Sequence, residues 1–270
     1  MHVAVIGGSG VAGTYAVLAL QAHGHTIREL SRRTGVDVYT GEGLNEALRD
    51  IDVVIDTLNT KSQRRRVSQD FFCTTARRIQ DAGEAQGVSH VVLLSILGMD
   101  RVRGYGYYDA KLAQETTATS GPVPVTVLRS AQFHEFPGQL LDRLRLGPLA
   151  VVPHIRSQPV AARTVGRHLA RLASEQPGGI VELAGPEVHD IADLARRLVH
   201  ARHERLRVLG VNLPGRAGRD MRTGALLATA STDVDGPTYD DWLLTGDAMG
   251  APRALSSVAP SAKEPSGSQP

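Results

Sequence analysis

The first thirteen residues contain the feature that most restricts how this chain can fold. An apolar run, Val3-Ala4-Val5-Ile6, ends in a glycine cluster, and a helical pattern follows at once. In this order, Gly7 allows a sharp turn, Gly10 leaves room for a diphosphate, and Gly13 lets the helix pack closely. The free N–H groups at the helix start attract an anion. The pattern predicts a dinucleotide site formed by Gly7, Gly8, Ser9, Gly10, Val11 and Gly13; the alternative is a glycine-rich turn that binds nothing.

Composition and charge exclude several other classes of protein. With 270 residues, 41% of them hydrophobic, the chain can form one large domain or a domain with a small lobe. A net charge of +2 favours neither nucleic acid nor an anionic membrane as a partner. Cys73 is the only cysteine, which excludes disulfide frameworks and favours a reducing, cytoplasmic compartment. We expect no membrane span, no secretory signal and no metal site, since His200 and His203 lack a third ligand.

Strand and helix patterns alternate through the first half of the chain. Short apolar runs are predicted as strands at residues 26–30, 36–39, 52–58, 90–94 and 124–128, with helices at 10–23, 41–49, 71–85 and 107–119 between them. This alternation predicts an α/β fold, a Rossmann-type doubly wound parallel sheet with a small C-terminal α/β substrate lobe. We divide the chain into a cofactor-binding core (1–130), an interleaved substrate-binding lobe (131–245) and a disordered tail (246–270) rich in Ala, Pro, Ser and Gly.

The residues after the second predicted strand bear on the choice of cofactor. An acid at this place would accept a hydrogen bond from the ribose of NAD, whereas arginine pairs with the 2′-phosphate of NADP. The chain has two consecutive arginines and a serine there, Ser31-Arg32-Arg33, with no acid beside them. We therefore expect NADP(H), against the alternative of two exposed surface arginines. Leu58 and Asn59, at the end of the strand at 52–58, are expected to border the cofactor, because ligands bind at the carboxyl edge of such sheets.

A tyrosine and a lysine are placed so that they could carry the chemistry. Tyr107 and Lys111 lie four residues apart, on one face of a predicted helix. A nearby ammonium would lower the pKa of the tyrosine and make its hydroxyl a usable proton donor or acceptor. Ser95, at the end of the preceding strand, could hold a substrate carbonyl. Two alternatives stay open: Tyr108 could replace Tyr107, or both tyrosines could be packing residues while Lys111 contacts the ribose.

Together these residues resemble a known superfamily. The glycine spacing, Ser31-Arg32-Arg33, Ser95 and Tyr107-x-x-x-Lys111 are similar to those of the short-chain dehydrogenase/reductases. The stretches 107–115 (YYDAKLAQE) and 128–136 (LRSAQFHEF) resemble, more specifically, the atypical NmrA-like NAD(P)H-binding branch. The resemblance implies that the glycines and arginines bind cofactor, that Ser95, Tyr107 and Lys111 are the catalytic set, and that Phe133, His134 and Tyr108 line the substrate pocket.

The sequence thus leads to hypotheses of different classes. The first is a cytoplasmic NADPH-dependent reductase of a carbonyl, enone or quinone-like small molecule, acting as a monomer or homodimer. The second is a non-catalytic sensor whose NADP(H) controls its affinity for a protein partner. A third keeps the cofactor as a helper for an isomerisation or cyclisation without net redox change. A cavity facing Ser95 and Tyr107 would favour an enzyme, and a tyrosine turned away would favour the sensor.

Overall fold

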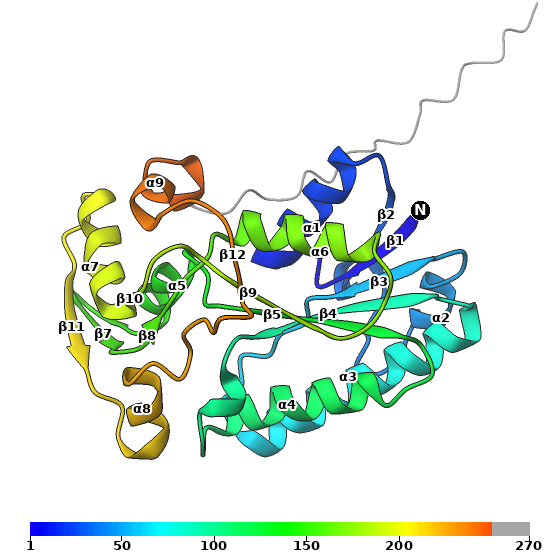
Figure 1. Cartoon of the computed structure of the whole chain (residues 1–270), viewed down its shortest axis with the longest axis horizontal. Helices are drawn as coiled ribbons and strands as arrows, with labels where there is room; N and C mark the ends of the chain where they lie inside the picture. Colours follow the sequence, from blue (N-terminus) through cyan, green and yellow to red (C-terminus); the bar gives the residue numbers. More distant parts are fainter. Residues whose placement is uncertain (250–270) are drawn as a thin grey trace, which may run out of the picture.

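The computed structural model describes residues 1–249, whose centre is a seven-stranded sheet (Figure 1). Its strands are β1 (His2–Ile6), β2 (Thr26–Leu30), β3 (Val53–Asp56), β4 (His90–Ile96), β5 (Val125–Ser130), β9 (Ile180–Ala184) and β12 (Asp233–Val234). They lie in the order β12-β9-β5-β4-β3-β1-β2, and all neighbouring pairs are parallel. The strand order reverses at β1, with β2 on one side and β3 on the other. This arrangement confirms the predicted Rossmann-type sheet.

Helices cover both faces of this sheet. In Figure 1, α1 (Val11–Ala22) and α6 (Ala162–Ala173) lie on one face, while α3 (Arg65–Gln86) and α4 (Gly106–Thr119) lie on the other. α1 and α6 approach closely, since a Cβ on Gly166 would lie 2.4 Å from the carbonyl carbon of Tyr15. Coverage on both sides explains why the central strands β1 and β3 are apolar without alternation: residues 3–6 are completely buried.

A smaller lobe lies beyond the carboxyl end of β5 (Figure 1). It contains a three-stranded sheet of β6 (Arg145–Leu146), β7 (Leu149–Pro153) and β11 (Arg207–Val211), and the pair β8 (Arg156–Ser157) and β10 (His189–Asp190). Its helices are α5 (Phe136–Arg143), α7 (Ile191–Ala201), α8 (Gly215–Arg222) and α9 (Tyr239–Leu243). Asp190 caps α7, because its carboxylate accepts the Ala192 N–H at 2.9 Å.

The strand predicted at residues 36–39 is absent. Asp37 forms only an isolated bridge to Glu42, and its carboxylate accepts the N–H groups of Tyr39 and Thr40. This side chain turns the backbone and competes with strand pairing. The helix predicted at 41–49 shortens to α2 (Leu44–Ala47), because Gly41 and Gly43 both have positive φ.

Several C-terminal segments rejoin the core. Helix α6 and strands β9 and β12 follow residue 130 in the sequence yet complete the main sheet and its cover. Within the segment expected to be a tail, Gly246–Met249 forms the 3-10 turn η3; residues 250–270 lie outside the described part of the chain. Among residues 1–249, no helix combines the length and the apolar character needed to cross a membrane.

Candidate cofactor and active site

The glycine turn between β1 and α1 has the shape that an anion site requires. Gly7 has a φ of +78°, and the Gly10 N–H donates to its carbonyl oxygen at 2.9 Å. A Cβ on Gly13 would lie 2.3 Å from that same oxygen, so only glycine fits there. No side chain caps α1, and its first turn has no acidic residue. Its first N–H groups therefore lack a side-chain acceptor and can bind a diphosphate.

Ser31, Arg32 and Arg33 follow β2 directly, at the same edge of the sheet as the glycine turn. Ser31 caps the short 3-10 turn η1 (Arg32–Thr34), in which both arginines are exposed and form no ion pair within residues 1–249. Sequence reasoning missed a nearby acid, because Glu29 lies within β2: a Cβ on Gly8 would lie 3.2 Å from its carboxylate oxygen. The glycine turn thus has an acidic side chain against it as well as two free guanidinium groups near it.

The carboxyl end of β3 meets the candidate catalytic helix. The Tyr107 hydroxyl donates to the side-chain oxygen of Asn59 at 2.7 Å, across 48 residues of sequence. Leu58 is half-buried beside it, and its N–H donates to the carboxylate of Asp56 at 2.9 Å. The fold thus brings the predicted tyrosine to the edge where Leu58 and Asn59 were expected to border the cofactor.

Lys111 does not act on Tyr107 as expected. The ammonium is buried; it donates to the Leu94 carbonyl at 2.8 Å and to the Gln114 side chain at 2.7 Å, and lies 4.9 Å from the centre of the Phe72 ring. Burial lowers the pKa of Lys111 to about 8. The predicted lowering of the tyrosine pKa is wrong for this arrangement: burial, together with the Tyr105 hydroxyl, raises the pKa of Tyr107 to about 12.

A buried network of hydrogen bonds connects the Lys111 ammonium to a carboxylate that balances its charge. Gln114, which accepts from Lys111, donates from its side-chain nitrogen to the Asp56 carboxylate at 3.1 Å. Asp56 is also buried, and burial raises its pKa while the Lys111 charge opposes that rise. Neither Gln114 nor Asp56 was predicted from the sequence as a neighbour of Lys111. The three-residue spacing of Lys111 and Gln114 on one helix was the available signal.

Ser95 and Tyr108 are both buried, and neither forms a hydrogen bond with Tyr107 in the described chain. The Ser95 hydroxyl donates to the Met99 sulfur at 3.8 Å, a weak acceptor. Tyr108 packs edge-on against Tyr105, with 4.8 Å between ring centres, and belongs to the apolar cluster that contains Leu140 and Leu141 of α5. This cluster joins the core to the lobe.

Phe133 and His134 lie just after β5. Phe133 is half-buried against the core beneath α1 and α6. His134 is 1% exposed; its Nε2 lies 3.0 Å from the Pro159 oxygen, and its ring contacts Tyr239 and Trp242. Burial lowers the pKa of His134 to about 4, so the ring is neutral at pH 7. The structure thus places His134 in the interior of the lobe.

Comparison with known proteins adds a family and a fold. A family model described as NAD(P)H-binding matches residues 7–162. No protein of curated function matches the sequence. Three of the similar solved structures are the dTDP-4-dehydrorhamnose reductase of Bacillus anthracis in complex with NADP, the NADPH-dependent quinone oxidoreductase of Escherichia coli, and the UDP-glucose 4-epimerase of Thermus thermophilus in complex with NAD.

These structures are similar over most of their length. The Bacillus reductase has 13% identity and a TM-score of 0.67, over 90% of this chain and 96% of that one. The Escherichia oxidoreductase has 17% identity and a TM-score of 0.60, over 89% of this chain and 98% of that one. The Thermus epimerase has 18% identity and a TM-score of 0.63, over 81% of this chain and 88% of that one. At such identities the likeness establishes the fold alone, and it agrees with the strand order described above.

Proposed function

Because this chain belongs to the NAD(P)H-binding family, we propose that it is an NADPH-dependent oxidoreductase that reduces a carbonyl, enone or quinone-like small molecule. The observation that carries the proposal is the hydrogen bond between Tyr107 and Asn59. It holds a hydroxyl at the carboxyl edge of the sheet, where the glycine turn also lies, and that edge is where ligands bind in such folds. The nicotinamide would supply the hydride when bound.

The protonation state of Tyr107 favours reduction over oxidation. With a pKa of about 12 the hydroxyl keeps its proton at neutral pH. A protonated phenol can donate to the oxygen of a carbonyl that gains negative charge, but it is a poor base for removing a proton from an alcohol. We therefore propose Tyr107 as the proton donor. For Ser95 we propose the orienting of the substrate oxygen, since its bond to the Met99 sulfur is weak enough to exchange.

For Lys111 the contacts favour a positioning role. The ammonium joins α4 to β4 through the Leu94 carbonyl and is braced by Gln114, so it fixes the helix that carries Tyr107. The ribose contact implied by the family resemblance would require this buried group to exchange partners. On the sequence resemblance we also propose that the chain belongs to the NmrA-like branch, and on its cysteine usage that it acts in the cytoplasm. We further propose a core of residues 1–130 and an interleaved substrate lobe within residues 131–245, from which α6, β9 and β12 return to the core.

The preference for NADPH is tested by the two arginines of η1. Replacing both Arg32 and Arg33 with alanine should weaken NADPH binding about 10²- to 10⁴-fold, because each charge-assisted hydrogen bond to the 2′-phosphate stabilises the complex by about 1.5–3 kcal/mol. NADH binding should stay nearly unchanged. Isothermal titration with both cofactors measures the two affinities.

Two controls make this test specific. Arg77→Ala removes an exposed arginine from α3 and should change neither affinity. Glu29→Gln should weaken NADH rather than NADPH if this carboxylate accepts from the ribose. Equal loss of both cofactors in the double arginine variant would contradict the proposed role in choosing NADPH.

A second candidate function is a sensor without turnover. It is favoured by the low exposure of Tyr107, 9%, and by the hydrogen bonds of the Lys111 ammonium, which go to Leu94 and Gln114. The deciding experiment is NADPH oxidation in the presence of a panel of ketones, enones and quinones. Turnover supports the reductase. NADPH binding without any oxidation, combined with cofactor-dependent capture of a protein partner, supports the sensor.

A further inference from the structure

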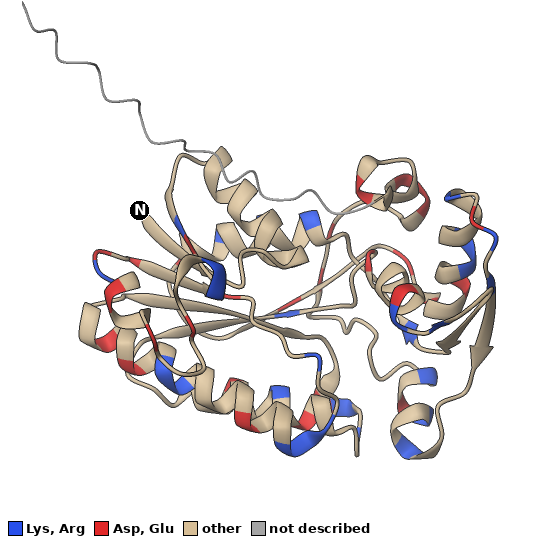
Figure 2. Cartoon of the chain, turned by 180° about the vertical axis from the view of Figure 1, so that it is seen from behind, with Lys and Arg blue, Asp and Glu red and all other residues tan. Residues whose placement is uncertain are grey.

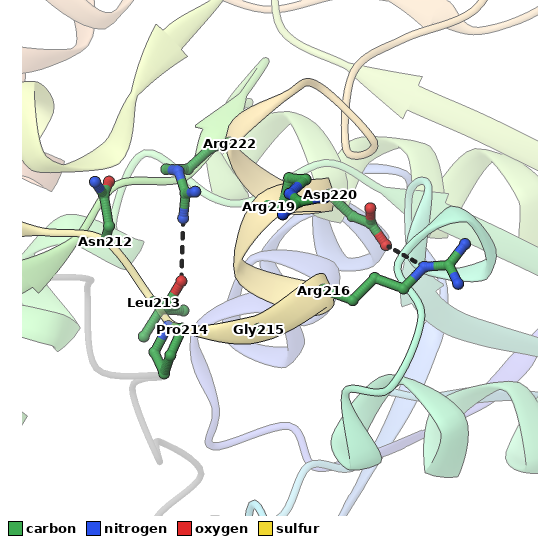
Figure 3. Close-up of a pocket in the computed structure, with 8 residues that line it drawn as sticks. All are labelled: Asn212, Leu213, Pro214, Gly215, Arg216, Arg219, Asp220 and Arg222. Carbon is green, nitrogen blue, oxygen red and sulfur yellow. Dashed lines mark hydrogen bonds and ion pairs between the residues drawn. The ribbon is translucent and has the colours of Figure 1, made fainter.

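An open pocket lies beside α8, in a part of the chain to which the proposed function gives no role. It has a volume of about 690 Å³, and its lining includes Asn212, Leu213, Arg216, Arg219, Asp220 and Arg222. Figure 3 shows these side chains around the first turns of α8. Three of the residues that line the pocket are arginines and one is an acid, so the lining is basic.

The arginines are only partly neutralised. Arg222 donates to the Leu213 carbonyl at 3.0 Å, and Arg216 lies at 4.0 Å from the Asp220 carboxylate (Figure 3). The Arg219 side chain is exposed and makes no hydrogen bond or ion pair with any residue in the described range 1–249. The Asp220 carboxylate also accepts the backbone N–H of Arg103 at 3.1 Å, which divides its charge between two partners.

The backbone of α8 adds to this positive potential. The helix begins after Pro214, has no side-chain cap, and has no acidic residue in its first turn. The positive end of the helix dipole therefore has no compensating carboxylate in the turn that faces the pocket. Figure 2 shows basic residues on α8 and also on α7, where Arg196 and Arg197 pair with Asp193 and Asp240.

Helix α8, which lines the pocket, contacts the elements around the candidate active site. The bond from Arg103 to Asp220 ties α8 to the segment that leads into α4 and Tyr107. Met221, on the other face of α8, belongs to the same buried cluster as Tyr107 and Tyr108. Arg143, exposed at the end of α5, lies close enough for its charge to oppose the rise in the pKa of Tyr107.

We propose that the α8 pocket binds an anionic group, a phosphate or a carboxylate, carried by the molecule whose carbonyl reaches Tyr107. Planar guanidinium groups bind both phosphate and carboxylate through paired hydrogen bonds. The identification of this molecule as the substrate rests on the proposed function. The anion site itself rests on the arginines, the pocket and the helix end.

The direct test is a phosphate titration followed by NMR on the full chain. Inorganic phosphate should shift the backbone amides of Gly215 and Gly218, in α8, separately from those of the glycine turn at residues 7–13. Arg219→Gln should weaken the affinity read from the α8 amides about tenfold, the loss expected for one charge-assisted hydrogen bond. Arg219 is the residue to change because its side chain holds no other described residue in place.

The control is Arg205→Gln, which removes an exposed arginine elsewhere in the lobe and should leave the phosphate affinity unchanged. Unshifted α8 amides at tens of millimolar phosphate, or equal affinity in the Arg219 variant and the wild type, would overturn the proposal. Either result would mean that the arginines of α8 are only solvated surface residues.

Kinetics then connects the pocket to the reaction. With carbonyl compounds matched in size, Arg219→Gln should raise KM about tenfold for a carboxylate and leave the neutral amide unchanged, with kcat constant in both cases. Equal effects on the two compounds would remove the pocket from substrate recognition. If no carbonyl compound is reduced at all, the oxidoreductase proposal fails, while the phosphate titration still decides whether α8 binds an anion.

Discussion

Tyr107→Phe is expected to lower kcat for NADPH-dependent reduction about 10²- to 10⁴-fold, the range typical of a lost general acid. NADPH affinity should stay within about twofold of the wild type, because the substitution removes only the hydroxyl. The side chain should still pack, since its ring lies edge-on to Phe72 with 5.8 Å between the ring centres. Stopped-flow reduction under single-turnover conditions, with cofactor titration in parallel, separates the chemical step from binding.

Tyr108→Phe is the matched control for this variant. Tyr108 is the neighbouring tyrosine, is also buried, and forms no hydrogen bond to Asn59. Its variant should retain the wild-type rate. If the two variants exchange their effects, Tyr108 is the donor, and the hydrogen bond to Asn59 marks a packing residue. If neither variant loses activity, tyrosine is not the proton donor.

The pH profile gives a second readout for Tyr107. Because its pKa is about 12, ionisation of this group should cause no loss of rate between neutral pH and about pH 10. A strong fall near pH 9, above the Lys111 pKa of about 8, would instead indicate a phenol whose pKa is lowered by a cation when cofactor and substrate are bound. Such a profile would restore the role first expected of Lys111, which burial and its partners oppose in this structure.

The fold was predictable to the extent that its signals are local. The apolar run before Gly7 and the glycine spacing each act within a few residues, and each is found as expected. The strand predicted at 36–39 was wrong because the Asp37 side chain competes with the ladder. Helix α8 was missed because its sequence, GRAGRDMR, has two glycines and almost no apolar face.

The site was harder to predict because it depends on where side chains point. The spacing of Tyr107 and Lys111 places them on one helix. It does not reveal that the Lys111 ammonium donates to the Leu94 carbonyl, which belongs to another element. Asn59 and Tyr107 are brought together only by parallel pairing of β3 with β4 and by the packing of α4. Glu29 was overlooked because it lies inside a strand, and its closeness to Gly8 is set by the pairing of β1 with β2.

The second large effect is expected at Glu135, which lies between the core and the lobe. One carboxylate oxygen accepts the Ala162 N–H at 3.2 Å, and the other has no hydrogen-bond partner in the described chain. Nearby, Arg163 holds Asp247 through two hydrogen bonds, of 3.0 and 2.9 Å. Burial, assisted by the charge of Asp247, raises the pKa of Glu135 from 4.5 to about 7.

The sign of the effect follows from the direction of this shift. The folded state holds the Glu135 proton more tightly than the unfolded state, so this group stabilises the fold at low pH. That contribution is lost as the pH rises from 4.5 to about 7. His134, whose pKa is lowered to about 4, has the opposite dependence over much of this range. In the wild-type protein alone, the two groups change the free energy of unfolding in opposite directions, so the contribution of Glu135 is masked. The difference between wild type and a Glu135 variant removes the contribution of His134, because both proteins contain it.

Glu135→Gln keeps the size of the side chain and an oxygen that can accept the Ala162 N–H, but it cannot ionise. The free energy of unfolding of the variant, relative to wild type, should rise by roughly 3 kcal/mol between about pH 4.5 and about pH 8. Urea denaturation across this range measures the difference. Glu84→Gln, an exposed change on α3, should show no such rise. A difference that stays constant with pH would mean that Glu135 titrates as an ordinary carboxylate, so that burial at the junction of α5 and α6 leaves its charge solvated.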